Sequence, residues 1–158
     1  MSDVTTYGQA DGQATQPQLA LQKIYVKDVS FEAPNTPHSF LEKTPPEVSI
    51  QMGIEHAQVS EPEYLFEAAL SITVTAAFQG KTVFLAEAKQ DGLFRIRGVP
   101  AEEMPKVLEI TCPSILLPFV RETINSLVER GGFPQLLINP INFEALHQQK
   151  HEAEPVQH

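Results

Sequence analysis

The stretch Ile110–Leu136 constrains the fold more than any other part of the sequence. Within it, apolar residues recur at spacings of three and four from Leu116 to Val128, as they do along one face of a helix. Gly131-Gly132 ends the pattern, because glycine adopts the left-handed conformation that closes a helix without a Cβ clash. We therefore expect one long helix whose apolar face covers a sheet.

A second side of this helix carries small and aromatic side chains, at Phe119, Thr123 and Ser126. The periodicity leaves two interpretations open. In the commoner one, the helix packs on the sheet of its own chain and this side faces solvent. In the other, Phe119, Thr123 and Ser126 pack against another copy of the chain and form an assembly interface.

The charge of the chain argues against some partners. Its 158 residues carry 11 Lys and Arg against 20 Asp and Glu, a net charge of −9, so nucleic acid and anionic membranes are poor partners. A basic protein surface fits better. Cys112 is the single cysteine, which excludes an intrachain disulfide and suits a reducing compartment. With no apolar signal region or membrane-spanning run, we expect a cytoplasmic protein without direct membrane insertion.

One domain accounts for most of the chain. Residues 1–18 are rich in Gly, Gln, Thr and Ser and are expected to form a disordered N-terminal tail. Residues 19–147 contain the periodic segments, and an apolar share of 42% is ordinary for a globular protein. Residues 148–158 are expected to form a flexible C-terminal tail.

Four segments alternate between apolar and polar residues as strands do: 19–35, 47–56, 64–78 and 82–90. The mixed alternation of the first indicates either a bulge or a strand that is covered on both faces. Gln79-Gly80 predicts a two-residue hairpin between the third and fourth segments, and Asp91-Gly92 predicts a second turn after the fourth. Strands followed by helices indicate an α+β fold.

The segments that flank the long helix are predicted as follows. Residues 99–109 are expected to form a loop. Residues 131–142 form a connection that carries five large apolar side chains, which either cap the core or line an apolar groove. Asn142 can cap a last short helix over residues 143–151.

No residue pattern indicates catalysis or a cofactor. Cys112 has no histidine near it in sequence, so we expect a buried, inert thiol. His147 and His151 are spaced as metal ligands on a helix can be, but the pair alone does not fix a metal, because cysteine or further buried carboxylate ligands are lacking in the sequence around it. Nucleotide-binding, hydrolase and metalloprotease motifs are absent from the sequence. We expect no enzyme, no metal and no cofactor.

Four blocks of the sequence resemble the bacterial SecB protein-export chaperone family: IYVKDVSFEAPNTPH, PEVSI, FLAEAKQDGLF and CPSILLPFVRETINSLVERGGFPQLLINPINFEAL. The resemblance runs from about Gln22 to His147. It implies a four-stranded antiparallel sheet with one long and one short C-terminal helix. It also implies a homotetramer, a dimer of dimers with the long helices between the sheets. The implied activity is that of an ATP-independent cytoplasmic chaperone, which holds unfolded precursor proteins and delivers them to the SecA translocation motor.

The resemblance also implies roles for individual residues. The client-binding groove would use Val48, Ile50 and Met52, to which we add Phe133 and Phe143 from the end of the chain. SecA would contact Asp28, Glu32, Leu85 and Glu87. Tetramer assembly would depend on Ala86, Ala88 and Gln90, on the opposite face of the strand that carries Leu85 and Glu87.

Two other classes of function stay open at this point. The chain could be an α+β domain that binds a small apolar ligand without chaperone activity, which would require convergent polar groups that the sequence does not indicate. It could also be an acidic scaffold that binds no client, which would leave the apolar connection unexplained.

Overall fold

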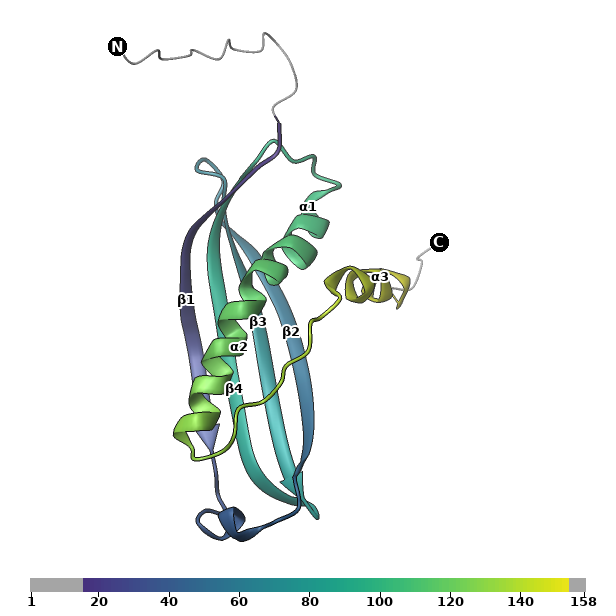
Figure 1. Ribbon diagram of the computed structural model, residues 1–158. Helices are drawn as coiled ribbons and strands as arrows, with labels where there is room; N and C mark the ends of the chain where they lie inside the picture. Colours follow the sequence, from purple (N-terminus) through teal and green to yellow (C-terminus); the bar gives the residue numbers. More distant parts are fainter. Residues whose placement is uncertain (1–15, 154–158) are drawn as a thin grey trace, which may run out of the picture.

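The computed structural model describes residues 16–153. Four antiparallel strands form one sheet, and the helices lie on one face of it (Figure 1). The strands are β1 (Gln18–Glu32), β2 (Glu47–Ser60), β3 (Leu65–Phe78) and β4 (Lys81–Arg97). Their order across the sheet is β1-β4-β3-β2, so β1 and β2 are the edges. The predicted α+β class with a four-stranded antiparallel sheet is confirmed.

The β3–β4 hairpin turns where the sequence predicted. Gln79 and Gly80 both have positive φ, 48° and 78°, as a two-residue hairpin with the twist of the flanking strands requires. Before β2, a short 3-10 helix, η1 (His38–Leu41), lies in the loop that follows β1. The first residues of the chain, 1–15, lie outside the described part.

The predicted bulge in β1 is confirmed and occurs twice. The pairing of β1 with β4 shifts register between Leu21 and Lys23, and again between Val26 and Asp28. Each extra residue reverses which side chains face the helices. After the second bulge, Phe31 pairs with Ala86 on the helix-covered face, which we call the inner face. The even-numbered residues that alternate with it lie on the uncovered outer face.

The turn predicted at Asp91-Gly92 is wrong, because both residues lie inside the continuous strand β4. Asp-Gly is a common turn sequence, but here glycine is needed for another reason. A Cβ on Gly92 would lie 2.6 Å from a ring carbon of Phe94 and 3.0 Å from a side-chain carbon of Leu116. The missing side chain therefore lets the long helix approach the sheet.

The long helix begins earlier than predicted. A turn of α-helix, α1 (Met104–Lys106), passes through a π-helical turn, η2 (Val107–Thr111), into α2 (Cys112–Arg130). Residues 104–109 of the expected loop are thus helical. Pro113 falls at the first positions after the π turn, where its missing N–H matters least. Gly132, with φ of 89°, closes the helix as expected, and Phe133 N donates to Val128 O over 3.1 Å.

The core lies between α2 and the inner face of β3 and β4. Leu116, Val120 and Ile124 of the helix are completely buried, as are Ile72 and Val74 of β3. Each such side chain contributes very roughly 1.5–3 kcal/mol relative to an exposed position. The helix stripe predicted from the spacing is therefore the face that packs on the sheet.

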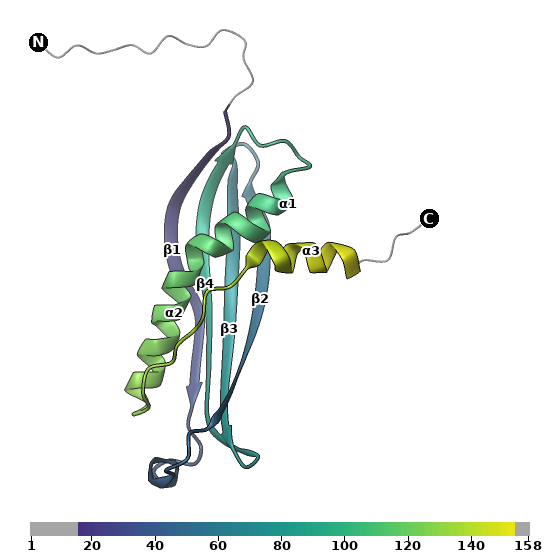
Figure 2. The ribbon, with the colours of Figure 1, turned by 45° about the vertical axis from the view of Figure 1, so that its right-hand side comes forward.

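The connection 131–142 leaves the end of α2, crosses the inner face and leads to α3 (Phe143–Ala153), as Figure 2 shows. Asn125 of α2 fixes it with two hydrogen bonds: Asn125 Nδ2 donates to Leu136 O (3.1 Å) and Asn125 Oδ1 accepts from Leu136 N (2.8 Å). Asn142 caps α3, since its Oδ1 accepts from Ala145 N over 3.0 Å. The helix extends two residues past its predicted end at His151, and residues 154–158 lie outside the described part.

Candidate binding surfaces

The inner face of β2 leaves large apolar side chains exposed. Val48, Ile50 and Met52 pair with β3 residues that point into the core, so all three face the helix side of the sheet. However, α2 packs mainly on β4 and β3, and only the η2 turn of the long helix lies against β2. Val48 is 44% and Ile50 42% exposed, while Met52 is half-buried. The alternation seen in the sequence thus produces an accessible apolar strip.

Aromatic rings form a wall at one end of this strip. The ring of Phe133, from the connection, lies 5.0 Å from that of Phe84 and 5.1 Å from that of Phe40. Phe40 and Phe133 line a cavity of about 510 Å³ together with Val48. Offset and tilted aromatic contacts at this separation are favourable. The wall therefore presents a preformed apolar surface beside the β2 strip.

A second cavity, of about 270 Å³, lies beside the same strand. Met52 and Ile54 of β2 and Leu146 of α3 supply its apolar lining. Glu109, His147 and Lys150 supply its polar part. Because Val48 lines the first cavity and Met52 the second, the β2 strip connects the two. We call this continuous surface the β2 groove.

Two of the predicted groove residues differ in their surroundings. Phe133 is half-buried and lines the larger cavity, whereas Phe143 is only 3% exposed and packs in the core. Phe143 therefore anchors the start of α3 and offers no surface to a ligand. Sequence reasoning missed Phe40, which contacts Phe133. The sequence signal was an apolar pair, Phe40-Leu41, inside a proline-rich polar loop.

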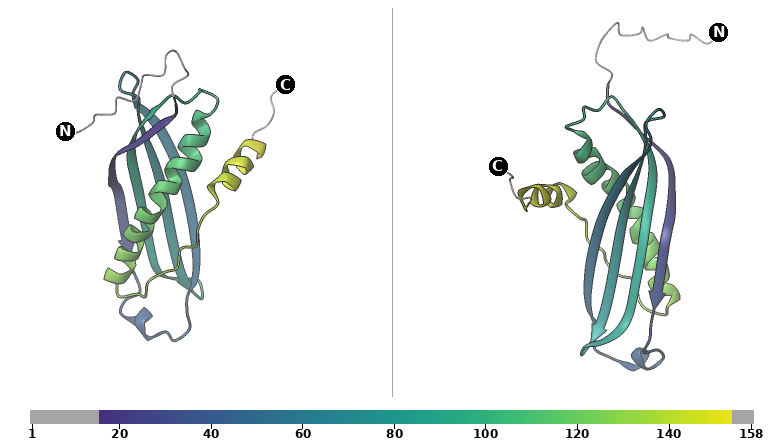
Figure 3. Two further views of the ribbon diagram at one scale, coloured as in Figure 1. Left: turned by 45° about the horizontal axis from the view of Figure 1, so that its top comes forward. Right: turned by 180° about the vertical axis from the view of Figure 1, so that it is seen from behind.

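The outer face of the sheet carries the four residues expected to contact SecA. Glu32 of β1 lies directly opposite Leu85 of β4, and Glu87 lies opposite Ser30 two residues further along. Asp28 follows on the same face. Residues paired in this way point to the same side of a sheet. The right-hand view of Figure 3 shows this side of the sheet, which the helices leave uncovered.

The acidic groups of this patch are not ion-paired among the described residues: Lys89, which lies opposite Asp28, pairs with Glu55 instead. Within residues 16–153, Asp28, Glu32 and Glu87 form no ion pair, and Glu87 only accepts a hydrogen bond of 3.3 Å from Thr73 Oγ1. Leu85 is half-buried among them. The second bulge of β1 brings Asp28 and Glu32 to the side on which the alternation of β4 already places Leu85 and Glu87. Bulge and alternation together produce three carboxylates around one apolar side chain.

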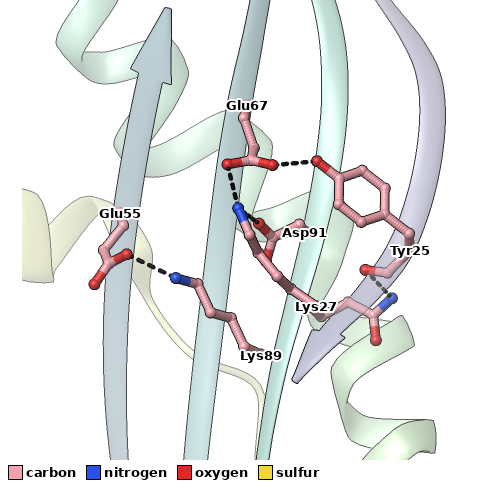
Figure 4. Close-up of polar contacts among 7 residues, drawn as sticks. Tyr25, Lys27, Glu55, Glu67, Lys89 and Asp91 are labelled. Atoms are coloured by element: carbon pink, nitrogen blue, oxygen red, sulfur yellow. Dashed lines mark hydrogen bonds and ion pairs between the residues drawn. The ribbon is translucent and has the colours of Figure 1, made fainter. Parts of the chain in front are cut away.

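A polar network occupies the adjoining part of the outer face (Figure 4). Tyr25 and Lys27 both donate hydrogen bonds to Glu67, the latter over 3.0 Å, and these bonds hold the pKa of Glu67 below its usual value. Lys27 Nζ also lies 3.7 Å from Asp91 Oδ2. The Asp91 side chain is completely buried; burial first, and then the charge of Glu67, raise its pKa.

The residues expected to control assembly fall into two groups. Ala86, Ala88 and Gln90 are buried beneath α2. Gln90 Oε1 accepts from Thr123 Oγ1 (2.9 Å) and Gln90 Nε2 donates to Tyr25 O (3.2 Å), so Gln90 joins the helix to the sheet. Phe119, in contrast, is 42% exposed on the outward side of α2. Changes at the strand positions would therefore act on an assembly through the position of the helix.

Cys112 is completely buried, and burial raises the pKa of its thiol to about 12. A thiol with such a pKa is not a nucleophile at neutral pH. No helix among the described residues combines the length and the apolar character needed to cross a bilayer.

Comparisons with known proteins agree on one family. The family model described as preprotein translocase subunit SecB matches residues 12–154. The protein-export protein SecB of Chromobacterium violaceum is 45% identical over 141 residues, covering 89% of this chain and 93% of that protein. The protein of the same name from Methylobacillus flagellatus is 46% identical over 145 residues, covering 91% of each.

A solved structure supports the fold independently. The SecB-like chaperone of Mycobacterium tuberculosis, solved with a peptide from an antitoxin, superposes with a TM-score of 0.64 at 16% identity, covering 78% of this chain and 90% of that one. The level of identity restricts this likeness to the fold. Family model and curated relatives go further, and on their evidence the chain belongs to the SecB family of protein-export chaperones, which hold precursor proteins and hand them to SecA.

Proposed function

We propose that this chain holds unfolded precursor proteins in the β2 groove, with Val48, Ile50, Met52 and Phe133 as contact residues, and that it does so in the cytoplasm. The observation that carries the proposal is the accessible apolar strip of β2 between two cavities. Members of the family are not enzymes, so holding and delivery need no chemical step.

Apolar contacts of this kind suit an unfolded client. Each client side chain buried in the groove contributes at most about 1.5–3 kcal/mol, and the contacts of one extended segment add up through their high effective concentration. A methionine and aromatic rings adapt to many sequences. A folded protein exposes no comparable segment, so binding selects chains that have not yet folded.

The acidic patch on the outer face is the proposed SecA contact, formed by Asp28, Glu32, Leu85 and Glu87. Its support is the register that places these residues on one uncovered side. The groove and the patch lie on opposite faces of the same single-layered sheet. A client and SecA could then be bound at the same time, as transfer requires.

The assembly is proposed to be a homotetramer built as a dimer of dimers. Two features support it. Apolar residues stay exposed on the inner side of the edge strand β1, at Val26 and Val29, and on the outward side of α2, at Phe119. An edge strand with unpaired backbone groups and exposed apolar side chains is a surface that proteins usually cover.

The decisive experiment compares two faces of one strand. In the groove variant, Val48, Ile50 and Met52 are replaced together by alanine; in the control, Ser49 and Gln51 on the outer face of β2 are replaced by alanine. Binding of an unfolded precursor, measured by calorimetry without nucleotide, should weaken at least about tenfold in the groove variant, since three apolar side chains lose most of their contact area. Equal affinities of groove variant and control would place client binding elsewhere.

A further inference from the structure

Three metal-ligating side chains converge where α3 meets the π-helical turn, and two of them, Glu109 and His147, also line the smaller cavity of the β2 groove. His147 and His151 lie one turn apart on α3, and their rings are 4.2 Å apart. Glu109 of η2 faces them: its Oε2 is 3.1 Å from His147 Nδ1 and 3.6 Å from His151 Nε2. One ligand atom from each of the three residues falls within 4.8 Å of the other two. The missing carboxylate of the sequence pattern is thus supplied by a distant segment.

The imidazole of His147 is buried without a hydrogen bond. Its side chain is only 10% exposed, and Nδ1 has no hydrogen-bond partner among the described residues although Glu109 Oε2 is near. The ring edge and the oxygen therefore lie side by side without the alignment of an N–H donor and its acceptor.

Glu109 is available as an anionic ligand. Its side chain is 8% exposed, and it forms an ion pair with Lys150 that leaves one carboxylate oxygen for the histidines. Lys150 Nζ lies 2.6 Å from Oε1, the oxygen that faces away from the histidine contacts. Oε2 is left directed at the two imidazoles.

We propose that Glu109, His147 and His151 form a binding site for a divalent transition-metal ion of the zinc class. Zinc bonds to imidazole nitrogen and carboxylate oxygen are about 2.0–2.1 Å long, so tetrahedral ligand atoms lie roughly 3.3 Å apart. The two distances from Glu109 Oε2, 3.1 and 3.6 Å, are close to this separation. Imidazole and carboxylate are also the ligand types that zinc accepts without cysteine.

The ion would join α3 to the long helix. Glu109 belongs to η2, while both histidines belong to α3, so a bound ion ties together segments that are about 40 residues apart in sequence. His151 is 45% exposed, so an ion can reach the cluster from solvent. Binding to the folded state only would lower the local opening of α3.

The test uses the full-length, tag-free chain after chelator treatment. Zn²⁺ affinity and stoichiometry are measured by competition with a chromophoric chelator, and Co²⁺ is added separately to record the visible absorption of a tetrahedral site. We expect one ion per chain, and at least about tenfold weaker binding in His151→Gln and in Glu109→Gln. Amide exchange in α3 should slow when Zn²⁺ is added.

Two variants serve as controls. Lys150→Gln keeps all three ligands and changes the same face of α3, so it should bind Zn²⁺ at least as tightly as the unchanged chain, because a positive charge is removed. His38→Gln changes a histidine of η1 and should leave binding unaltered. The proposal is overturned by no binding, by half an ion per chain, by unaltered binding in His151→Gln, or by loss of binding in Lys150→Gln.

Discussion

Asp91 is an ionisable residue in an environment that disfavours its charged form. Its carboxylate is completely buried on the outer side of β4, and neither oxygen has a hydrogen-bond partner among the described residues. Lys27 Nζ, 3.7 Å away, offsets part of the desolvation cost, but Glu67 is a second carboxylate beside it. The net result is a pKa above the ordinary value of 3.8. Folding therefore favours the neutral form of Asp91.

This has a consequence for stability. A carboxyl group with a raised folded pKa contributes stability below its unfolded pKa, near 3.8, and loses it as pH rises through the folded value. Asp91→Asn removes the ionisable group and supplies an amide that can donate to Glu67. We expect the variant to be more stable at pH 7 by roughly 1–2 kcal/mol, with a smaller difference near about pH 4.

Urea unfolding at fixed protein concentration measures this difference. Asp28→Asn is the matched control, since Asp28 is an exposed carboxylate on the same face and should change stability little. A variant at position 91 that is less stable than the parent at pH 7 would mean that Lys27 more than offsets the burial of the charge.

At the scale of elements, the connection 131–142 shows how a segment without regular structure is held over an apolar surface. Its backbone meets α2 through Asn125, whose amide both donates to and accepts from Leu136. The polar groups of Leu136 are half-buried and would otherwise be unsatisfied. One side chain of the long helix thus fixes the wall of the β2 groove.

Asn125→Ala should therefore loosen the connection. Two backbone groups lose their partners, which costs about 2 kcal/mol in the free energy of unfolding. Amide exchange at residues 133–137 should become faster, because the wall opens locally. Asn139→Ala, an exposed position in the same connection, is the control and should leave both measurements unchanged. Unaltered exchange in Asn125→Ala would show that packing of Phe133 alone holds the segment.

The elements differ in how well their sequences predicted them. Gln79-Gly80 and Asp91-Gly92 look alike as turn signals, yet only the first is a turn, since the second glycine makes room for Leu116. That requirement is tertiary and is absent from local sequence. The start of the long helix was missed for a similar reason. The π turn before Pro113 interrupts the regular spacing of an α-helix, so the periodicity of apolar residues does not extend across it.

The candidate surfaces follow the same division. Alternation along β2 and β4 predicted which residues share a face, because the side-chain period of a strand is two. In the sequence, Phe143 and Phe133 are both aromatic residues that follow the long helix. Phe143 is nevertheless buried, since α3 packs its first residue into the core. The cluster of Glu109 with His147 and His151 joins segments about 40 residues apart, so no spacing rule could find it.

At the scale of the whole molecule, the sheet separates two surfaces of opposite character. The inner side has an apolar groove at β2 and exposed apolar groups at β1, and the outer side carries Asp28, Glu32 and Glu87, which form no ion pair among the described residues. With a net charge of −9, the chain repels further acidic surfaces. Association with other copies is therefore expected through the inner, apolar side.

Native mass spectrometry at micromolar concentration tests the assembly. The unchanged chain should give the mass of four copies. Phe119→Lys introduces a charge on the outward side of α2 and should shift the mass to species of fewer chains, because an unpaired buried charge is costly at an interface. Leu137→Lys, at an exposed apolar position of the connection, should keep four copies. A single-copy mass for the unchanged chain would contradict the dimer of dimers.

In the proposed arrangement, SecA docks on the outer side of the sheet. Exposed ion pairs contribute only about 0–1 kcal/mol each and are screened over roughly 10 Å in 0.1 M salt. Completing the burial of the half-buried Leu85 is worth a similar amount, of order 1 kcal/mol. The apolar contact should therefore matter as much as any single charge, while the charges act chiefly on the rate of encounter.

The double change Leu85→Gln with Glu87→Lys removes one contact of each kind and reverses a charge. SecA affinity, measured by surface-bound kinetics, should fall at least about tenfold, and affinity for an unfolded precursor should stay unchanged, because the groove is on the other side of the sheet. The alanine variant at Val48, Ile50 and Met52 should behave in the opposite way. If both affinities fell together in either variant, or if SecA association were insensitive to salt, client and motor would not use separate faces.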